Sequence, residues 1–266
     1  NAFSCAALAV TTYNVTVNPL PAPAIAGPSP VCVNTTQTYT TAGGMSNYLW
    51  TVSAGGTITA GGTTTSDFVT VTWNTAAPQT VSVNYTDGNG CTAAAATVNN
   101  ITVNPRPTPT LTGTASVCQF STSHIYTTQA GQFNYNWVIP AGATVTAGGT
   151  ATSNTVTLTW NTLGPKTITV NYDNAFGCNS LTAASFNVTV NPLPAPTITG
   201  PASVCLNSTG NIYTTEAGQT NYVWTVPTGG AITAGGGSAD GFVTVTWNTV
   251  GPHTVNVNHN NAFGCA

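Results

Sequence analysis

The chain has 266 residues, of which 41% are hydrophobic and 3% are charged, and its formal net charge is −3. Two basic side chains cannot build the clustered lysine and arginine surface that nucleic-acid binding needs, so we expect no nucleic-acid partner. Five scattered acidic side chains argue against repeated calcium cages and against a charge-rich catalytic centre. We therefore expect no enzyme, no metal and no cofactor, although the apolar content is high enough for packed cores.

Hydropathy and the first residues set two further expectations. No stretch of about 18 apolar residues occurs, so we expect no membrane-spanning segment. The chain starts at Asn1 without a basic and apolar leader, which we interpret as a mature product or a fragment of a longer protein.

Sequence motifs return along the chain at intervals of 86 or 87 residues. The recurring positions are Trp50, Trp137 and Trp224; Trp73, Trp160 and Trp247; Cys32, Cys118 and Cys205; and Cys5, Cys91, Cys178 and Cys265. A unit of this length suits one small β-sandwich better than a helical solenoid repeat. The spacing predicts a closing strand of a preceding repeat at 1–18, repeats at 19–104 and 105–191, and a third repeat at 192–266 that lacks its last strand.

Within each repeat the sequence alternates between apolar and polar residues, as strands do. In the first repeat Val69, Val71 and Trp73 alternate with threonines, which places one face on a core and one in water. Paired glycines separate such segments and indicate turns. We expect strands near residues 23–27, 36–41, 47–53, 57–60, 68–74, 79–86 and 96–103. Seven short strands per repeat predict an all-β fold of tandem immunoglobulin-like sandwiches in a linear array.

The joints between repeats are rich in proline. They contain Asn-Pro-Leu-Pro-Ala-Pro or Asn-Pro-Arg-Pro-Thr-Pro and no flexible glycine/serine linker. Proline fixes φ, and closely spaced prolines favour an extended, semi-rigid chain. We therefore expect a stiff rod.

The motif combination resembles a known family. Val-Cys, Tyr-Thr-Thr, Asn-Tyr-x-Trp, Thr-Ala-Gly-Gly, Val-Thr-Trp-Asn-Thr and Asn-Ala-Phe-Gly-Cys are similar to the PKD-like, immunoglobulin-like repeats of very large cell-surface proteins in Bacteroidota, including gliding adhesins and other cargo of the type IX secretion system. The resemblance covers nearly the whole chain and implies an extracellular array that spaces or displays something. Many PKD domains carry an acidic turn where this chain has Trp50 followed by Thr-Val-Ser-Ala-Gly, so a calcium role is not carried over.

Most other notable side chains have a structural interpretation. All six tryptophans are expected in cores, and Trp73 lies in phase with the inward-facing valines before it. His124, His253 and His259 do not repeat and lack metal-ligand spacing. Lys166 corresponds to a glutamine and a histidine in the other repeats, so a repeated lysine–asparagine cross-link is excluded.

The cysteines carry the most specific chemistry. Two per repeat, without metal-ligand spacing, predict disulfides in an oxidising compartment. The simple pairing lies within each repeat and leaves Cys5 unpaired or paired outside the chain; it joins Cys32 with Cys91, Cys118 with Cys178, and Cys205 with Cys265. Sandwich topology raises an alternative, because it places Cys32 nearer Cys178 and Cys118 nearer Cys265, where disulfides would link neighbouring repeats.

The first residues match a closing strand. Tyr13, Val15 and Val17 correspond to Phe186, Val188 and Val190 and form an inward-facing set. Two explanations stay open: the chain is a window of a longer array, or this strand is donated to the third repeat of another copy. Either would continue the protein head-to-tail as a fibre.

These observations favour a structural and adhesive protein that forms a stiff stalk or fibre on the cell surface. Its expected partners are further copies or repeats, with surface glycans as candidate ligands. One alternative is an array of carbohydrate-binding modules, which requires Tyr48, Phe133 or Phe242 exposed in a row. Another is an accessory region of a secreted hydrolase.

Overall fold

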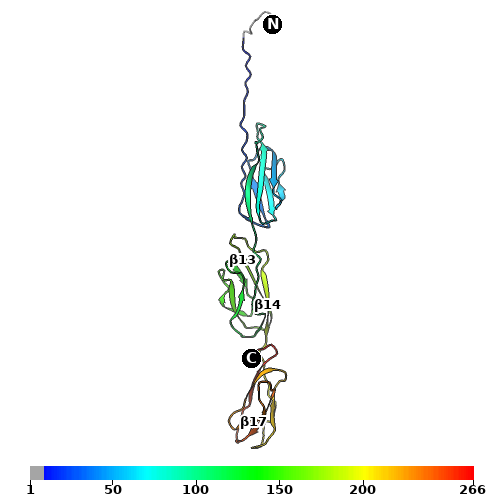
Figure 1. Ribbon diagram of the computed structural model, residues 1–266, viewed down its shortest axis with the longest axis vertical. Coiled ribbons are helices and arrows are strands. Elements are labelled where there is room, and N and C mark those ends of the chain that lie inside the picture. Colours follow the sequence, from blue (N-terminus) through cyan, green and yellow to red (C-terminus); the bar gives the residue numbers. More distant parts are fainter. Residues whose placement is uncertain (1–8) are drawn as a thin grey trace. The chain divides into compact units, whose positions relative to one another are not determined.

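The computed structural model describes residues 9–266, and all secondary-structure elements in that range are β-strands (Figure 1). The first repeat contains β1 (Val31–Cys32), β2 (Thr35–Thr40), β3 (Ser46–Val52), β4 (Gly56–Gly61), β5 (Phe68–Trp73), β6 (Pro78–Thr86) and β7 (Thr97–Asn104). The second contains β8 (Ser116–Cys118), β9 (His124–Thr127), β10 (Phe133–Val138), β11 (Ala143–Gly148), β12 (Thr155–Trp160), β13 (Gly164–Asp173) and β14 (Ala184–Asn191). The third contains β15 (Asn211–Thr214), β16 (Thr220–Thr225), β17 (Gly230–Gly235), β18 (Phe242–Trp247) and β19 (Asn256–Asn260).

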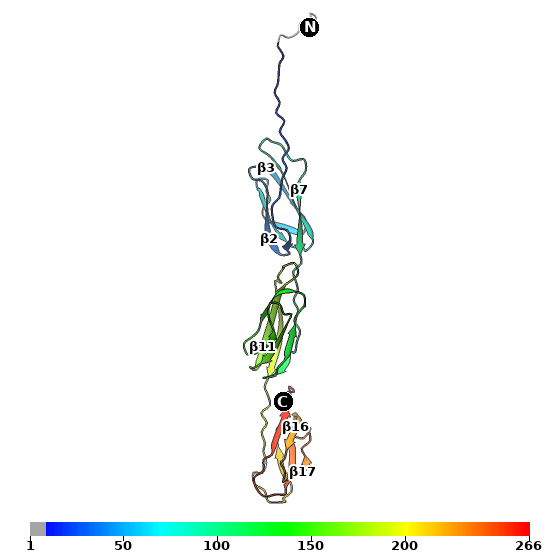
Figure 2. The ribbon, with the colours of Figure 1, turned by 90° about the vertical axis from the view of Figure 1, so that its left-hand side faces the viewer.

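Each of the first two repeats is a sandwich of a four-stranded and a three-stranded sheet. The strand orders are β1-β7-β6-β3 and β2-β5-β4 in the first repeat, and β10-β13-β14-β8 and β11-β12-β9 in the second. Figure 2 labels β2, which belongs to the three-stranded sheet of the first repeat, and β3 and β7, which belong to its four-stranded sheet. The all-β fold of tandem sandwiches predicted from the sequence is confirmed. The chain forms two compact units, one ending at Arg106 and one starting at Pro107 that contains the second and third repeats.

The first strand of a repeat differs from the expectation. Residues 23–27 form no strand, and only Ala26 makes an isolated bridge, to Thr40. The strand forms later, at β1, and pairs in parallel with β7. Proline explains the shift, because Pro21, Pro23 and Pro28 have no backbone NH to donate to a sheet ladder.

A tyrosine–tryptophan pair lies at the centre of each core. Trp160 Nε1 donates a hydrogen bond to the Tyr126 hydroxyl at 3.1 Å, and the two rings meet edge-to-face. Both side chains are fully buried. Gly113 lies so close to the Tyr126 ring that a Cβ atom at this position would overlap it. The pair recurs in the first repeat as Trp73 and a tyrosine, and in the third as Trp247 and Tyr213.

The tryptophans of the other series link β3, β10 and β16 to the connections before β5, β12 and β18. Their Nε1 atoms donate to the backbone oxygens of Ser66, Ser153 and Asp240 at 2.9, 2.9 and 2.8 Å. The structure places Trp50, Trp73, Trp160, Trp224 and Trp247 among the buried residues, and Trp137 is half-buried against the core of its repeat.

The third repeat is open at one edge. In the described residues β19 has only β16 as a sheet partner, whereas the corresponding β13 lies between β10 and β14. Val255 and Val257 are only half-buried, although their counterparts Ile168 and Val170 are fully buried. Tyr213 is likewise half-buried. The exposed part of this core is the part that a seventh strand covers in the second repeat.

Candidate functional site at the joint between repeats

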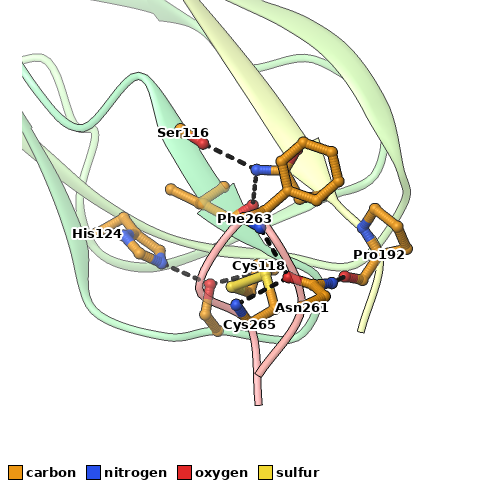
Figure 3. The surroundings of a disulfide bond; sticks show 10 residues. Ser116, Cys118, His124, Pro192, Asn261, Phe263 and Cys265 are labelled. Atoms are coloured by element: carbon orange, nitrogen blue, oxygen red, sulfur yellow. Dashed lines mark hydrogen bonds between the residues drawn. A yellow bond between two sulfur atoms is a disulfide. The ribbon is translucent and has the colours of Figure 1, made fainter. Parts of the chain in front are cut away.

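A disulfide joins two successive repeats. Cys118 at the end of β8 is bonded to Cys265 of the third repeat, and their Cα atoms lie 5.6 Å apart (Figure 3). Pairing of Cys118 with Cys178 is therefore wrong. Cys118 lies beside Asn191, the last residue of β14, while Cys178 precedes the first residue of that strand. Eight strand residues span roughly 25 Å, far more than a disulfide can bridge.

The other expected pairs within repeats are also wrong. Cys91 and Cys205 have free thiols. Cys32 and Cys178 both take part in disulfides. Cys5 lies outside the described residues. The same topology explains these corrections, because a repeat presents its two cysteines at opposite ends of its sandwich.

A side-chain-capped turn presents Cys265. The backbone NH groups of Phe263 and Cys265 donate to Asn261 Oδ1 at 3.0 and 3.1 Å. Gly264 has a φ of 78°, which glycine adopts without steric cost, and its NH donates to the Asn261 carbonyl at 2.9 Å. Because the turn holds itself together, the position of this cysteine does not depend on the disulfide.

The first repeat contains the same turn with a free thiol. Asp87 Oδ1 accepts hydrogen bonds from the backbone NH groups of Asn89 and Cys91, both at 2.9 Å. Gly90 takes a φ of 79°, as its counterpart does in the third repeat. These capping residues were not predicted from the sequence, although it carries the signal: an Asn or Asp stands four residues before Cys91, Cys178 and Cys265, and a glycine directly precedes each of these cysteines.

A second preformed loop presents the other cysteine of the disulfide. After Cys118 the chain turns through Phe120, whose φ is 62° and whose NH donates to the Trp160 carbonyl at 2.6 Å. In the third repeat Asn207 has a φ of 58° and donates to the Trp247 carbonyl at 2.8 Å. Cys205 is thus held in the same loop, but its thiol is free and the residue is exposed.

Hydrogen bonds fix the linker at the joint. Asn191 Nδ2 donates to Ser116 Oγ at 2.8 Å and to the Val117 carbonyl at 3.2 Å, which locks the end of β14 onto β8. The next residue, Pro192, accepts a hydrogen bond from Asn261 Nδ2 at 2.7 Å. Figure 3 shows Ser116, Pro192 and Asn261 around the disulfide. The linker and the cysteine turn therefore meet at one point, and both are attached to the end of the second repeat.

The open edge of the third repeat forms a groove of about 570 Å³. Val204, Tyr213, Trp247 and Val255 are among its lining residues. In the second repeat the corresponding Val117, Tyr126, Trp160 and Ile168 belong to one core cluster together with Val188 and Val190 of β14. The groove is thus the space that a closing strand fills elsewhere.

The segment that matches a closing strand lies outside any sheet. Residues 10–25 form no strand, and Tyr13, Val15 and Val17 are 90%, 71% and 88% exposed. The corresponding Val188 and Val190 are 1% and 2% exposed. The matching sequences of the two segments therefore lie in opposite environments, one in a core and one in water.

Other candidate groups are scattered. Tyr48 is buried, so it forms no exposed row with Phe133 and Phe242, which are exposed in different repeats. Over residues 9–266 no group of three or more His, Cys, Asp or Glu side chains is arranged to hold a metal ion. In the same range no helix is long and apolar enough to cross a membrane.

Few titratable groups are perturbed. Hydrogen bonds from the side chains of Thr197 and Thr215 hold the pKa of Glu216 below its ordinary value of 4.5. Burial lowers the pKa of His124, whose Nε2 lies 2.7 Å from Ser121 Oγ near the disulfide. Burial raises the pKa of the Tyr126 hydroxyl. No cluster of these groups forms a proton-transfer site.

The PKD-like domain family matches the chain three times, over residues 18–101, 104–188 and 191–266, so the chain belongs to this family. Among solved structures, the Escherichia coli adhesin FdeC is 15% identical with a TM-score of 0.33, covering 93% of this chain and 96% of that chain. The D00-D0 domain of intimin is 17% identical with a TM-score of 0.35, covering 63% and 100%. Invasin, a bacterial integrin-binding protein, is 16% identical with a TM-score of 0.34, covering 89% and 56%. Curated proteins give no match.

Proposed function

We propose that this member of the PKD-like family is a non-catalytic spacer outside the cell, in which successive sandwiches form a stiff stalk or fibre on the cell surface. The observation that carries the proposal is the Cys118–Cys265 disulfide, which attaches the third repeat to the second. On the motif combination described above, we place its source among the cell-surface proteins of Bacteroidota that use the type IX secretion system. An adhesive role at the cell surface is part of the same proposal.

Two attachments at one joint support a stiff connection. The linker leaves the second repeat at Asn191 and contains Pro192, Pro194 and Pro196, which restrict its φ angles. The disulfide adds a second covalent connection beside it. A single flexible tether allows two domains to rotate freely, whereas two tethers at one end remove most of that freedom.

The disulfide also supports the location. Stable disulfides form in oxidising compartments and are rare in the cytosol. With 3% charged residues the surface offers few ion pairs to stabilise the fold. Covalent links between repeats therefore suit a protein that works outside the cell, where thiols are not kept reduced.

Small-angle X-ray scattering tests the spacer function. Three sandwiches in series, each about 35–40 Å long, should give a maximum dimension of at least roughly 110 Å. The matched control is the Cys118→Ser, Cys265→Ser double variant, which should scatter as a more flexible particle of similar contour. A compact particle in the oxidised protein would overturn the proposal. The location outside the cell would be refuted if a reagent that cannot cross membranes labelled the native protein only after the cells were lysed.

A further inference from the structure

We propose that Asn89 is a site of spontaneous covalent modification: the backbone nitrogen of Gly90 attacks the Asn89 side-chain amide, and hydrolysis of the resulting ring leaves aspartate or isoaspartate at the tip of the turn. The inference goes beyond the proposed function and does not rest on it, because it concerns the chemistry of one turn. It is carried by the dipeptide itself, by the open surroundings of its two residues, and by the contrast with other groups in turns of the same kind.

Asn89 and Gly90 form the single Asn-Gly pair of the chain. A bond between an asparagine Cγ and the backbone nitrogen of the next residue closes a five-membered ring. A side chain on that next residue hinders the closure, and glycine has none. Other asparagines of the chain are followed by residues that do carry a side chain, such as Ser180 or Ala262. The sequence therefore makes Asn89 the most reactive asparagine.

The surroundings of the pair leave room for the reaction. Both residues are exposed, at the tip of the turn between β6 and β7. A Cβ atom at Gly90 would have no neighbour within 4 Å apart from the adjoining residues. Among the described residues, only the backbone NH of Asn89 is hydrogen-bonded, to Asp87 Oδ1 at 2.9 Å, and its side-chain amide has no partner. This amide can therefore rotate toward Gly90 without losing a contact.

The structure favours Asn89 over Asp87, which also precedes a glycine. Asp87 Oδ1 accepts hydrogen bonds from the backbone NH groups of Asn89 and Cys91, both at 2.9 Å. These two bonds hold the Asp87 carboxyl group inside the turn, so ring closure there would have to break both. Of the two side chains that precede a glycine in this turn, only Asn89 is not held.

The equivalent turns lack the reactive arrangement. In the third repeat Phe263 takes the position of Asn89, and Asn261 takes that of Asp87. The side chain of Asn261 is held at both ends of its amide, because Oδ1 accepts two backbone NH groups and Nδ2 donates to the Pro192 carbonyl at 2.7 Å. The turn of the second repeat likewise has a phenylalanine at its tip. The first repeat alone places an asparagine where nothing needs to be capped.

The turn sets the rate of the reaction. The backbone NH of Gly90 donates to the Asp87 carbonyl at 3.0 Å, and this bond has to open before the nitrogen can attack. A single hydrogen bond of this kind reduces the open population roughly two- to tenfold. We therefore expect ring closure in the folded protein, at a rate about two- to tenfold below that of the unfolded chain.

The reaction needs water and no other reagent. The Gly90 nitrogen loses its proton and bonds to Asn89 Cγ, and the side-chain nitrogen of Asn89 leaves as ammonia, which gives a succinimide. Water then adds to one of the two ring carbonyls and opens the ring. Opening at one carbonyl leaves aspartate in a normal backbone. Opening at the other leaves isoaspartate, in which the backbone runs through the former side chain.

The product changes the turn in two ways. The new carboxylate changes the formal net charge from −3 to −4 and lies close to Asp87, which it repels. Isoaspartate also adds one backbone atom, so Asp87 Oδ1 should lose at least one of its two NH donors. The equivalent turn of the third repeat links two repeats through Cys265. The modification thus falls on a type of turn that this protein uses as half of a joint.

Incubation of the full chain in H₂¹⁸O tests the proposal. The protein is held in mildly alkaline buffer, digested with pepsin because the chain has only two basic residues, and analysed by mass spectrometry. Asn89 should gain one ¹⁸O atom before any other asparagine does, in two separable peptides of equal mass. Protein unfolded in guanidinium chloride should react about two- to tenfold faster. An unmodified Asn89, or faster reaction at another asparagine, would overturn the proposal.

Two variants separate the turn from the dipeptide. Asp87→Ala removes the side-chain cap and should bring the rate in the folded protein to within about twofold of the unfolded rate; a rate below that of the unsubstituted protein would refute the protective role of the turn. Asn89→Phe installs the residue of the other turns and is the matched control, which should gain no ¹⁸O in this peptide.

Hydrogen exchange of the aged protein tests the structural consequence. Amides of residues 87–91 should exchange faster after modification, and unchanged exchange would refute the loss of the cap. In Asn89→Phe these amides should keep their protection on the same incubation. None of these results depends on whether the particle is extended in solution, so this proposal and the spacer function can fail separately.

Discussion

Removal of the Cys118–Cys265 disulfide should destabilise the third repeat and leave the first unchanged. The change is a double substitution to serine, so that no lone thiol remains. The third repeat is the sensitive one because its core is open on one side, with Val255 and Val257 only half-buried. The disulfide limits how far its chain can expand when it unfolds.

The magnitude follows from the register of the second repeat. The two cysteines are 147 residues apart in sequence, but Cys118 is paired with Asn191 at the end of β14. While the second repeat stays folded, the loop that the disulfide closes runs only from Asn191 to Cys265. A loop of about 74 residues corresponds to roughly 4 kcal/mol in the chain-entropy model.

Hydrogen exchange resolved by mass spectrometry measures the loss in free energy of unfolding for each repeat separately. The slowest amides of β17 and β18 report the free energy of unfolding of the third repeat, and those of β5 and β6 provide a control within the same molecule. Loss of most protection in the third repeat alone is the expected result. An unchanged third repeat, or an equal loss in the first, would refute the loop-closure reasoning.

Three further changes test the cores and the charged groups. Gly113→Ala should destabilise the second repeat by about 1–3 kcal/mol, because the added Cβ would overlap the Tyr126 ring, and hydrogen exchange of β12 would show it. Tyr126→Phe should cost about 1–3 kcal/mol in the same assay, since it leaves the buried Trp160 NH without its acceptor; an unchanged exchange rate would show that the NH finds another acceptor. The carboxylate of Glu216, whose pKa is lowered chiefly by a hydrogen bond from Thr197, stabilises the third repeat above about pH 4.5 and loses this contribution as the pH falls further. Glu216→Gln should therefore reduce the acid dependence of unfolding below that pH, and identical acid curves would contradict this reasoning.

Most of the fold could be predicted from the sequence because apolar and polar residues alternate so regularly along its strands. Val69, Val71 and Trp73 face one core in the structure, as their spacing predicts. The strand predicted at 23–27 is absent because the prolines in and around it have no NH to donate to a sheet ladder. A parallel pair such as β1 with β7 joins residues about 70 apart, so no local pattern reports it.

The cysteine pairing could not be obtained from spacing alone. Cys118 lies closer in sequence to Cys178 than to Cys265, and only the direction of β14 shows that the nearer partner lies at the far end of the sandwich. The capped turn was readable in principle, since Asn or Asp stands four residues before each turn cysteine. Its meaning as half of a joint depends on the position in space of the loop after β8, which no local sequence pattern reports.

The disulfide at the joint also determines how the protein would respond to tension. A covalent path that enters at Cys118 can pass through the two sulfur atoms to Cys265 without following the backbone between them. A pull applied at Cys118 and Cys265 would therefore not extend the 147 residues that the bond encloses, even if both repeats lost their structure. An unfolded segment of that size would otherwise add roughly 500 Å of contour length. Oxidation thus fixes the maximal extension of this part of the chain by bond lengths rather than by the stability of its sandwiches.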